Sequence, residues 1–245
     1  VRCAKDGPAM IRAFGVVIPA HNEEILIANC LKALKYAAKQ GGVPPVRMVV
    51  VVDSCTDATA EVADQYDVEV MEVQLQSAGG ARAEGFEYIV ASLDVDLEDL
   101  WLCTTDADSI VPEHWFLHQM RREAEGYDAV VGTVVVEDWS EHSNQTRRRY
   151  AKRYEARDGH PHVHGANLGL SAIALKAIGG FPPLSLAEDH ALVAGLMKMD
   201  FQICRSAMAP VTTSARRDWR APDGFGALLN SMDEPAWRRV LRLHS

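Results

Sequence analysis

The sequence predicts an α/β fold: a single domain around a doubly wound, mostly parallel sheet with helices on both faces. Short apolar runs typical of buried strands alternate with segments of helical periodicity over the first 110 residues. The strand segments are apolar on both faces, as in parallel sheets that helices cover on each side. A length of 245 residues with 48% hydrophobic and 24% charged residues suits one domain with a sizeable core. No repeat or linker divides the chain, so we expect one domain over residues 1–245.

The first half of the chain is regular. Four short apolar runs predict strands, at residues 14–20, 46–52, 68–73 and 100–105. Three segments between them predict helices, at residues 23–42, 54–66 and 79–93. Acidic residues in the first turn and Gly41–Gly42 at the end mark the limits of the first helix. Ser54 or Thr56 can accept hydrogen bonds from the first free amides of the second helix.

The second half, from about residue 111, is less regular. Further strands are predicted at residues 127–138 and 201–206. Helices are predicted at residues 143–157, directly after residues 162–171, and within residues 179–200. We therefore expect residues 14–110 to form a regular half of the domain and residues 111–245 a more irregular one.

Charge and cysteine content exclude some classes of protein. The formal net charge of −9 gives no basic footprint, so we expect no nucleic-acid partner. Five scattered cysteines without CxxC or metal-type spacing indicate a reduced, cytoplasmic protein. Because no run of about 18 apolar residues occurs, no integral membrane segment is expected. Residues 234–245 predict a basic amphipathic helix docked on its own domain, with membrane contact as the alternative.

Polar side chains follow three of the predicted strands at the point where each strand ends. They are His21, Asn22 and Glu23 after the first strand, Asp53 after the second, and Asp106 and Asp108 after the fourth. In doubly wound sheets, ligands bind at the carboxyl ends of the strands. The sequence therefore predicts a ligand site at this edge of the sheet.

Asp106 and Asp108 are like charges one residue apart at the end of a core strand, where they repel and resist desolvation. A divalent cation between them would remove the repulsion. Hard ions such as Mn²⁺ or Mg²⁺ accept a few carboxylate oxygens and keep places for phosphate oxygens. We therefore predict Asp106 and Asp108 as metal ligands, with Mn²⁺ or Mg²⁺ as cofactor and a diphosphate as a further ligand.

Six segments in order resemble the signature of family 2 glycosyltransferases with the GT-A fold. They are VVIPAHNEE, VVVDSCTDAT, AGGARAEGF, TTDADS, HGANLGLS and AEDHAL. Their order and spacing extend over roughly residues 14–213. The resemblance implies a nucleotide-binding half at about residues 14–110 and an acceptor-binding half at about residues 111–245.

The resemblance also implies roles for individual residues on the donor side. The nucleotide-sugar site would contain Pro19, Ala20, His21, Glu23, Asp53, Arg82, Asp106 and Ala107. Among these, Asp53 would bind the base and Arg82 would lie near the phosphates. Asp106 would lie near the ribose and donor sugar, and Asp108 would hold the metal that bridges the diphosphate.

On the acceptor side, the resemblance implies a pocket for acceptor and donor sugar formed by His164, Gly165, Asn167 and Glu188. Asp189 matches the general base of the family. A carboxylate at that position can take the proton from an acceptor hydroxyl as it attacks the anomeric carbon. Glu188 beside it would orient a helix or the sugar.

Two further segments allow alternative interpretations. Arg216 and Arg217 lie in the turn-rich residues 213–226, so they can form a loop that clamps a diphosphate or a solvated basic loop. His160, His162 and His164 alternate along one face, which suggests a zinc site, but no cysteine or carboxylate nearby completes a tetrahedron. For His164 we favour the acceptor pocket.

We predict a metal-dependent, inverting glycosyltransferase that moves a sugar from a nucleoside-diphosphate donor to a hydroxyl of a soluble acceptor. A UDP-sugar is the favoured donor and GDP-mannose the next. The alternatives are a non-catalytic nucleotide-sugar-binding module, a nucleotidyltransferase, or a phosphatase that uses Asp-x-Asp. The intact carboxylates Asp106, Asp108 and Asp189 disfavour a non-catalytic binding module. The loop at 19–24 lacks the glycines and lysine expected of a nucleotidyltransferase. The Asp-x-Asp motif follows the fourth strand, which disfavours a phosphatase.

Overall fold

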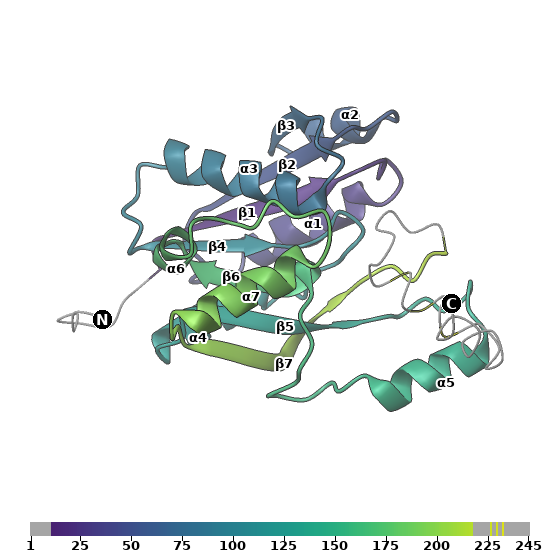
Figure 1. Ribbon diagram of the computed structural model, residues 1–245. Helices are drawn as coiled ribbons and strands as arrows, with labels where there is room; N and C mark the ends of the chain where they lie inside the picture. Colours follow the sequence, from purple (N-terminus) through teal and green to yellow (C-terminus); the bar gives the residue numbers. More distant parts are fainter. Residues whose placement is uncertain (1–10, 218–225, 227–228, 230–231, 233–245) are drawn as a thin grey trace.

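A computed structural model describes residues 11–217 together with 226, 229 and 232 (Figure 1). Its strands are β1 (Ala13–Ala20), β2 (Val46–Asp53), β3 (Glu69–Val73), β4 (Leu100–Thr104), β5 (Ala129–Val135), β6 (Leu168–Ser171) and β7 (Ile203–Thr212). Its helices are α1 (Ile27–Ala38), α2 (Thr59–Asp64), α3 (Ala78–Ser92), α4 (Trp115–Ala124), α5 (Asn144–Arg153), α6 (Ala172–Ala177), α7 (Glu188–Lys198) and the 3-10 helix η1 (Gly165–Asn167).

The strands form one sheet in the order β3-β2-β1-β4-β6-β5-β7. β6 is antiparallel to its neighbours β4 and β5, and the other pairings are parallel. The strand order turns back at β1, which has β2 on one side and β4 on the other. One edge of the sheet, here called the carboxyl edge, therefore collects the ends of the parallel strands and the entry into β6. This arrangement confirms the predicted α/β class.

Helices cover both faces of the sheet, because alternate residues of each strand point to opposite sides. On β1, Phe14, Val16 and Ile18 pack into a core shared with α1 and α4. Ala13 and Val17 pack into a second core, shared with α3, α6 and α7. Figure 1 shows α3 and α7 lying across the same side of the sheet. Packing on both faces fixes the strand ends that carry the polar residues.

The first helix is shorter than the sequence predicts, because the acidic residues before it make tertiary contacts. We expected a helix from residue 23, whereas α1 begins at Ile27. The backbone N–H of Glu23 donates to Thr59 Oγ1 at 2.8 Å, and that of Glu24 donates to Asp57 Oδ2 at 3.1 Å. These bonds tie the segment to the start of α2 and hold it in a turn.

The predicted cap of the second helix was wrong. α2 begins at Thr59, and its backbone N–H donates to Asp57 Oδ1 at 3.1 Å. Ser54 instead donates to Asp53 Oδ1 at 2.9 Å, and the backbone N–H of Thr56 donates to Asn22 Oδ1. Thr56 therefore joins the segment after β2 to the segment after β1, and Ser54 bonds within the end of β2.

The back half contains elements that the sequence did not reveal to us. α4 and the four-residue β6 were not predicted, and β7 continues six residues past the predicted end at residue 206. Among the described residues, no helix is long and apolar enough to cross a membrane. The predicted helix at 234–245 lies outside the described residues, as do Cys3 and Arg220. The division into two functional halves stays a prediction.

Candidate active site

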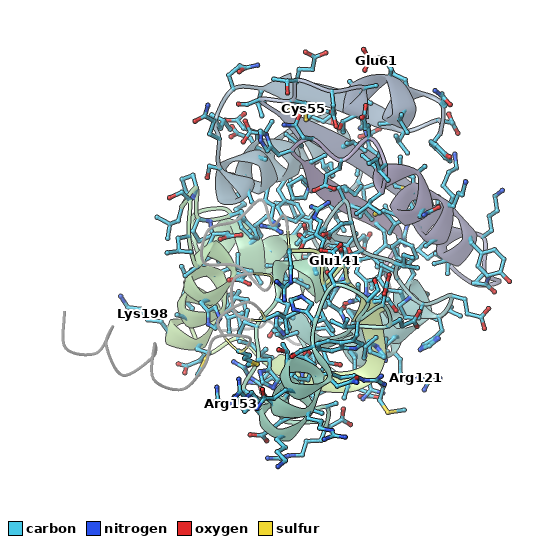
Figure 2. All side chains as sticks on the ribbon, turned by 90° about the vertical axis from the view of Figure 1, so that its right-hand side faces the viewer. Cys55, Glu61, Arg121, Glu141, Arg153 and Lys198 are labelled. Carbon is cyan, nitrogen blue, oxygen red and sulfur yellow. The ribbon has the colours of Figure 1, made fainter. Side chains whose placement is uncertain are left out.

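The carboxyl edge brings together loops from distant parts of the chain. It collects the segments after β1, β2, β4 and β7, the 3-10 helix before β6, and the start of α7. Figure 2 looks onto this edge from the right-hand side of Figure 1, with Glu141 near the centre of the view. Most of the predicted site residues lie on these segments, Arg82 lies on α3, and six of them form two clusters of charge.

The Arg82 cluster consists of Arg82, Thr104, Asp106 and Glu188. The Arg82 side chain projects from α3 and is only 4% exposed. Its Nε donates to Thr104 Oγ1 at 3.2 Å, while its terminal nitrogens donate to Asp106 and Glu188. A Cβ at Gly165 would lie 2.5 Å from Arg82 Nη2, so only glycine leaves room for this guanidinium. The cluster joins the end of β4 to the start of α7.

The Arg216 cluster consists of Glu23, Asp108 and Arg216. Arg216, on the segment after β7, donates from both terminal nitrogens to the two carboxylate oxygens of Glu23. One of these nitrogens also lies 3.5 Å from Asp108 Oδ2. Glu23 is 6% exposed, so this bidentate ion pair is largely shielded from water. The predicted clamp residue Arg216 therefore lies directly on the acidic residues of the site.

The surroundings of Asp108 disfavour its charged form. Burial raises its pKa to about 7, and the charge of Asp106 acts in the same direction. Arg216 lowers that pKa, and Glu23 raises it. The protein itself compensates this negative charge only in part. Because the charge lies on hard carboxylate oxygens, the site fits a divalent cation such as Mn²⁺ or Mg²⁺.

The described residues provide no group of three His, Cys, Asp or Glu side chains suited to hold a metal. Asp106 and Asp108 thus offer at most two protein ligands, and phosphate oxygens and water would complete the shell. The same finding gives no support, within the described chain, to zinc at His160, His162 and His164.

Asp53 anchors a loop of the carboxyl edge. It is 4% exposed, and its Oδ1 accepts from the backbone N–H groups of Leu75 and Gln76, at 2.7 and 2.8 Å. Its Oδ2 accepts from the backbone N–H of Ser77 at 2.7 Å. Burial alone would raise the pKa of Asp53, but these backbone hydrogen bonds lower it below the ordinary value. Contact of Asp53 with a nucleotide base stays a prediction.

The other predicted donor-side residues lie close to Asp53 or within the strand ends. His21 Nδ1 lies 2.7 Å from the carbonyl oxygen of Asp53, which links the ends of β1 and β2. Ala20 and Ala107 are each 3% exposed, and Pro19 is half-buried in β1. Because the side chains of Ala20 and Ala107 are small, a ligand here would meet the backbone.

Asp189 lies in the first turn of α7, next to the Arg82 cluster. Its Oδ2 accepts from the backbone N–H of Gly165 at 3.0 Å, and its Oδ1 accepts from the backbone N–H of His190 at 2.7 Å. The carboxylate is therefore fixed in position by the loop that passes in front of Arg82.

His164 is held in its neutral form beside Gly165. The backbone N–H of Val134 donates to Tyr154 Oη at 2.8 Å, so the Tyr154 hydroxyl is free to donate to His164 Nε2 at 3.0 Å. Burial lowers the pKa of His164 to about 3, and the neighbouring His162, His160 and His190 act in the same direction. Tyr154 was not singled out in the sequence, which has no local signal linking it to His164.

Two predicted site residues have internal partners. Asn167 is 2% exposed, and its Nδ2 donates to the carbonyl oxygens of Thr133 and Ala209. Its Oδ1 accepts from Trp115 Nε1 at 2.9 Å. Arg217 binds Glu141 through its backbone N–H and its Nε, at 2.7 and 2.6 Å. Roles of Asn167 in a sugar pocket and of Arg217 in a clamp stay predictions.

The strand order and the acidic residues at the carboxyl edge agree with the fold that the sequence predicted. The sequence model described as "Glycosyl transferase family 2" matches residues 15–178. The chain therefore belongs to glycosyltransferase family 2.

Solved structures of similar fold agree with this assignment. TarS of S. aureus, in complex with UDP-GlcNAc, superposes with a TM-score of 0.62 at 15% identity, covering 86% of this chain and 61% of that one. The mannosyltransferase PcManGT of Pyrobaculum calidifontis, in complex with GDP-Man and Mn²⁺, gives 0.61 at 17% identity, covering 86% and 59%.

GalNAc-T7, with UDP, GalNAc and Mn²⁺, gives a TM-score of 0.58 at 15% identity, covering 85% of this chain and 44% of that one. At such identities the likeness shows the fold, which is GT-A. The present chain spans about three fifths of the length of the TarS and PcManGT chains (61% and 59%). A search of curated protein sequences found no match.

Proposed function

We propose that this chain transfers a sugar from a nucleoside-diphosphate donor to an acceptor hydroxyl with inversion at the anomeric carbon, and that UDP-sugars are preferred to GDP-mannose. The observation that carries the proposal is the convergence of Asp106, Asp108 and Asp189 on the carboxyl edge of a family 2 fold. Ligands in solved structures of similar fold support a nucleotide sugar as donor.

On the donor side, the loop after β1 (Pro19, Ala20, His21 and Glu23) and the segment fixed by Asp53 would border the base and ribose. Asp106 and Asp108 would hold Mn²⁺ or Mg²⁺, which supplies positive charge to the departing diphosphate. Arg216 lies beside this site with donors suited to phosphate oxygens. Arg82 acts more remotely in this proposal, because Asp106 and Glu188 already hold its guanidinium.

On the acceptor side, Asp189 would take the hydroxyl proton while that oxygen attacks the anomeric carbon. The new bond joins the acceptor oxygen to the anomeric carbon, and the bond from that carbon to the diphosphate oxygen breaks. The proton remains on Asp189 and the electron pair leaves with the diphosphate. The backbone N–H groups of Gly165 and His190 hold Asp189 in position for this step.

A donor screen tests the proposal directly. Thermal melts with UDP-, GDP- and dTDP-sugars in the presence of Mn²⁺ should show a selective rise in melting temperature for UDP-sugars, because a ligand that binds only the folded state stabilises it. Calorimetric titration of UDP should give weaker binding in EDTA than in Mn²⁺. Asp108→Ala should remove this dependence on metal, whereas Asp53→Ala should weaken binding both with and without metal. Equal affinity in EDTA and in Mn²⁺ would overturn the role of the metal.

The acceptor is proposed to be soluble and the protein cytoplasmic. The formal net charge of −9 disfavours binding to anionic bilayers. A flotation assay with anionic vesicles at physiological salt should leave the full chain in the unbound fraction. Recovery of the chain with the vesicles would contradict this part of the proposal.

A further inference from the structure

Arg216 is presented to the site by a segment with several anchors. Ser109 Oγ donates to Thr213 Oγ1 at 3.0 Å, and His142 Nε2 lies 2.6 Å from the carbonyl oxygen of Ala215. Arg217 binds Glu141 on the other side. The position of the Arg216 guanidinium over Glu23 and Asp108 is therefore supported on both flanks.

Arg216 supplies the positive charge for this side of the site. The side chains of Glu23 and Asp108 are only 6% and 18% exposed, so leaving them without a cation would be costly. Arg82 is already paired with Asp106 and Glu188. Arg216 thus does for Glu23 and Asp108 what a divalent ion would do.

A metal ion at Asp108 and the present guanidinium position exclude each other electrostatically. One Arg216 nitrogen lies 3.5 Å from Asp108 Oδ2, so a divalent ion bound to this carboxylate would face a positive charge within a few ångströms. A guanidinium has five N–H donors, so it can bond to phosphate oxygens and to the Glu23 carboxylate at the same time.

Building on the function proposed above, we propose that Arg216 is a resident counter-cation that competes with the divalent metal at Asp108. The free metal then binds weakly to the empty site. A nucleoside diphosphate reverses this competition, because its phosphates accept hydrogen bonds from Arg216 and draw the guanidinium away from Asp108. Glu23 acts as a positioning residue that keeps Arg216 at the site in both states, and metal and nucleotide enter together.

Binding of Mn²⁺ alone to the nucleotide-free protein tests this competition. Free Mn²⁺ can be followed by electron paramagnetic resonance, with no need for catalysis. Arg216→Gln should bind Mn²⁺ about tenfold more tightly than the wild type, because one positive charge beside the ion is lost. Arg216→Lys retains the charge and should resemble the wild type.

Arg12→Gln is the matched control for net charge. Arg12 lies next to the start of β1, at the opposite edge of the sheet, where its 70% exposed side chain pairs with Asp99. This variant should leave Mn²⁺ binding unchanged. With Mn²⁺ saturating, Arg216→Gln should bind UDP about tenfold more weakly, since a phosphate partner is lost. The two effects of one substitution then have opposite signs.

The proposal is overturned if Arg216→Gln binds Mn²⁺ no more tightly than the wild type, or if Arg12→Gln gains as much. Circular dichroism checks folding, and Arg216→Met replaces the Gln variant if that variant unfolds. Failure to transfer any sugar, with the Mn²⁺ result as expected, would count against the proposed function alone. If sugar transfer proceeds and substitution of Arg216 leaves the Mn²⁺ affinity unchanged, the result would count against the counter-cation role alone.

Discussion

The two charge clusters at the carboxyl edge use the same chemistry in different ways. In the Arg82 cluster, a side chain that is 4% exposed comes from a packed helix and is held by three partners. In the Arg216 cluster, a side chain that is 19% exposed comes from a loop and is held by Glu23, with Asp108 farther away at 3.5 Å. The first is suited to fix the geometry of the site, and the second is suited to exchange partners.

The surroundings of each arginine reinforce this difference. Gly165 leaves room for the Arg82 guanidinium and also binds Asp189, so the Arg82 side of the site holds the proposed base in place. The Arg216 side carries Asp108, whose pKa is raised by burial and by Asp106. We therefore expect substitutions on the Arg82 side to affect turnover and stability, and those on the Arg216 side to affect ligand binding.

The largest expected effect follows from Asp189→Asn, which keeps the shape of the side chain and removes its basicity. General-base catalysis contributes roughly 10²–10⁴-fold, so kcat should fall by about that factor while donor affinity stays close to that of the wild type. Turnover, donor affinity and the anomeric configuration of the product should be measured on one preparation. Full activity, or a product that retains the donor configuration, would mean that Asp189 is not the base.

The next effect compares the two arginines directly. Arg82→Met leaves Asp106 and Glu188 without their shared cation and should lower the free energy of unfolding by about 3–5 kcal/mol. Arg216→Met should cost about 1–2 kcal/mol, because Asp108 can take up a proton and the Arg216 side chain is itself more exposed than that of Arg82, 19% against 4%. Denaturant unfolding of both variants measures the difference. Equal losses would contradict the distinction between a fixed and an exchangeable arginine.

Titration should act with opposite sign on His164, next to Gly165, and on Asp108 in the Arg216 cluster. The folded-state pKa of His164 is lowered to about 3, so its contribution to stability is present above the unfolded value and is lost as pH falls. The folded-state pKa of Asp108 is raised to about 7, so its contribution is present at low pH and is lost as pH rises through that value.

His164→Gln keeps an acceptor for Tyr154 and should remove about 2 kcal/mol of the stability loss between pH 7.5 and pH 5. Asp108→Asn should make the loss over that interval larger. Chemical unfolding at both pH values gives both results. A pH dependence that neither substitution alters would show that other groups control it.

The smallest effect concerns the helix that carries Arg82. Ser77 caps α3 by accepting from the backbone N–H of Gly80 at 3.1 Å, and Ser143 caps α5 in the same way at Thr146. Each change to alanine should cost about 1 kcal/mol of stability. Only Ser77→Ala should also weaken UDP binding, because the backbone N–H of Ser77 binds Asp53, the residue predicted to contact the base, whereas α5 carries none of the charged residues of the site. Equal UDP affinities in the two variants would show that the α3 cap does not influence the site.

The regular half of the fold was predictable because its signals are local. The four predicted strands β1–β4 and the three helices between them appear in order, since each strand is an apolar run and each helix has apolar residues at helical spacing. The back half depends on partners that are far away in the sequence. β6 has four residues and contains Gly169, so its own sequence pattern does not predict a strand that pairs with β4 and β5.

The same distinction applies to the site. Asp106 and Asp108 were identified because a strand end places them together, whatever the rest of the chain does. The pairing of Glu23 with Arg216 joins residues 193 positions apart, and no periodicity in the sequence connects them. The sequence could name both residues as parts of the site, but only the structure, in which the segment after β7 meets the loop after β1, shows that they bind each other.

Asn167 has a consequence for how the molecule assembles. Its amide is satisfied only when α4, β5 and β7 are all in place, since Trp115, Thr133 and Ala209 are its partners. A partly formed back half would bury an amide with missing bonds, which is energetically unfavourable. Folding of these elements should thus be all-or-none, and the loop that holds Asp189 should become ordered in the same event. A newly made chain would then acquire its proposed base in the same step that brings Arg216, which follows β7, to Glu23.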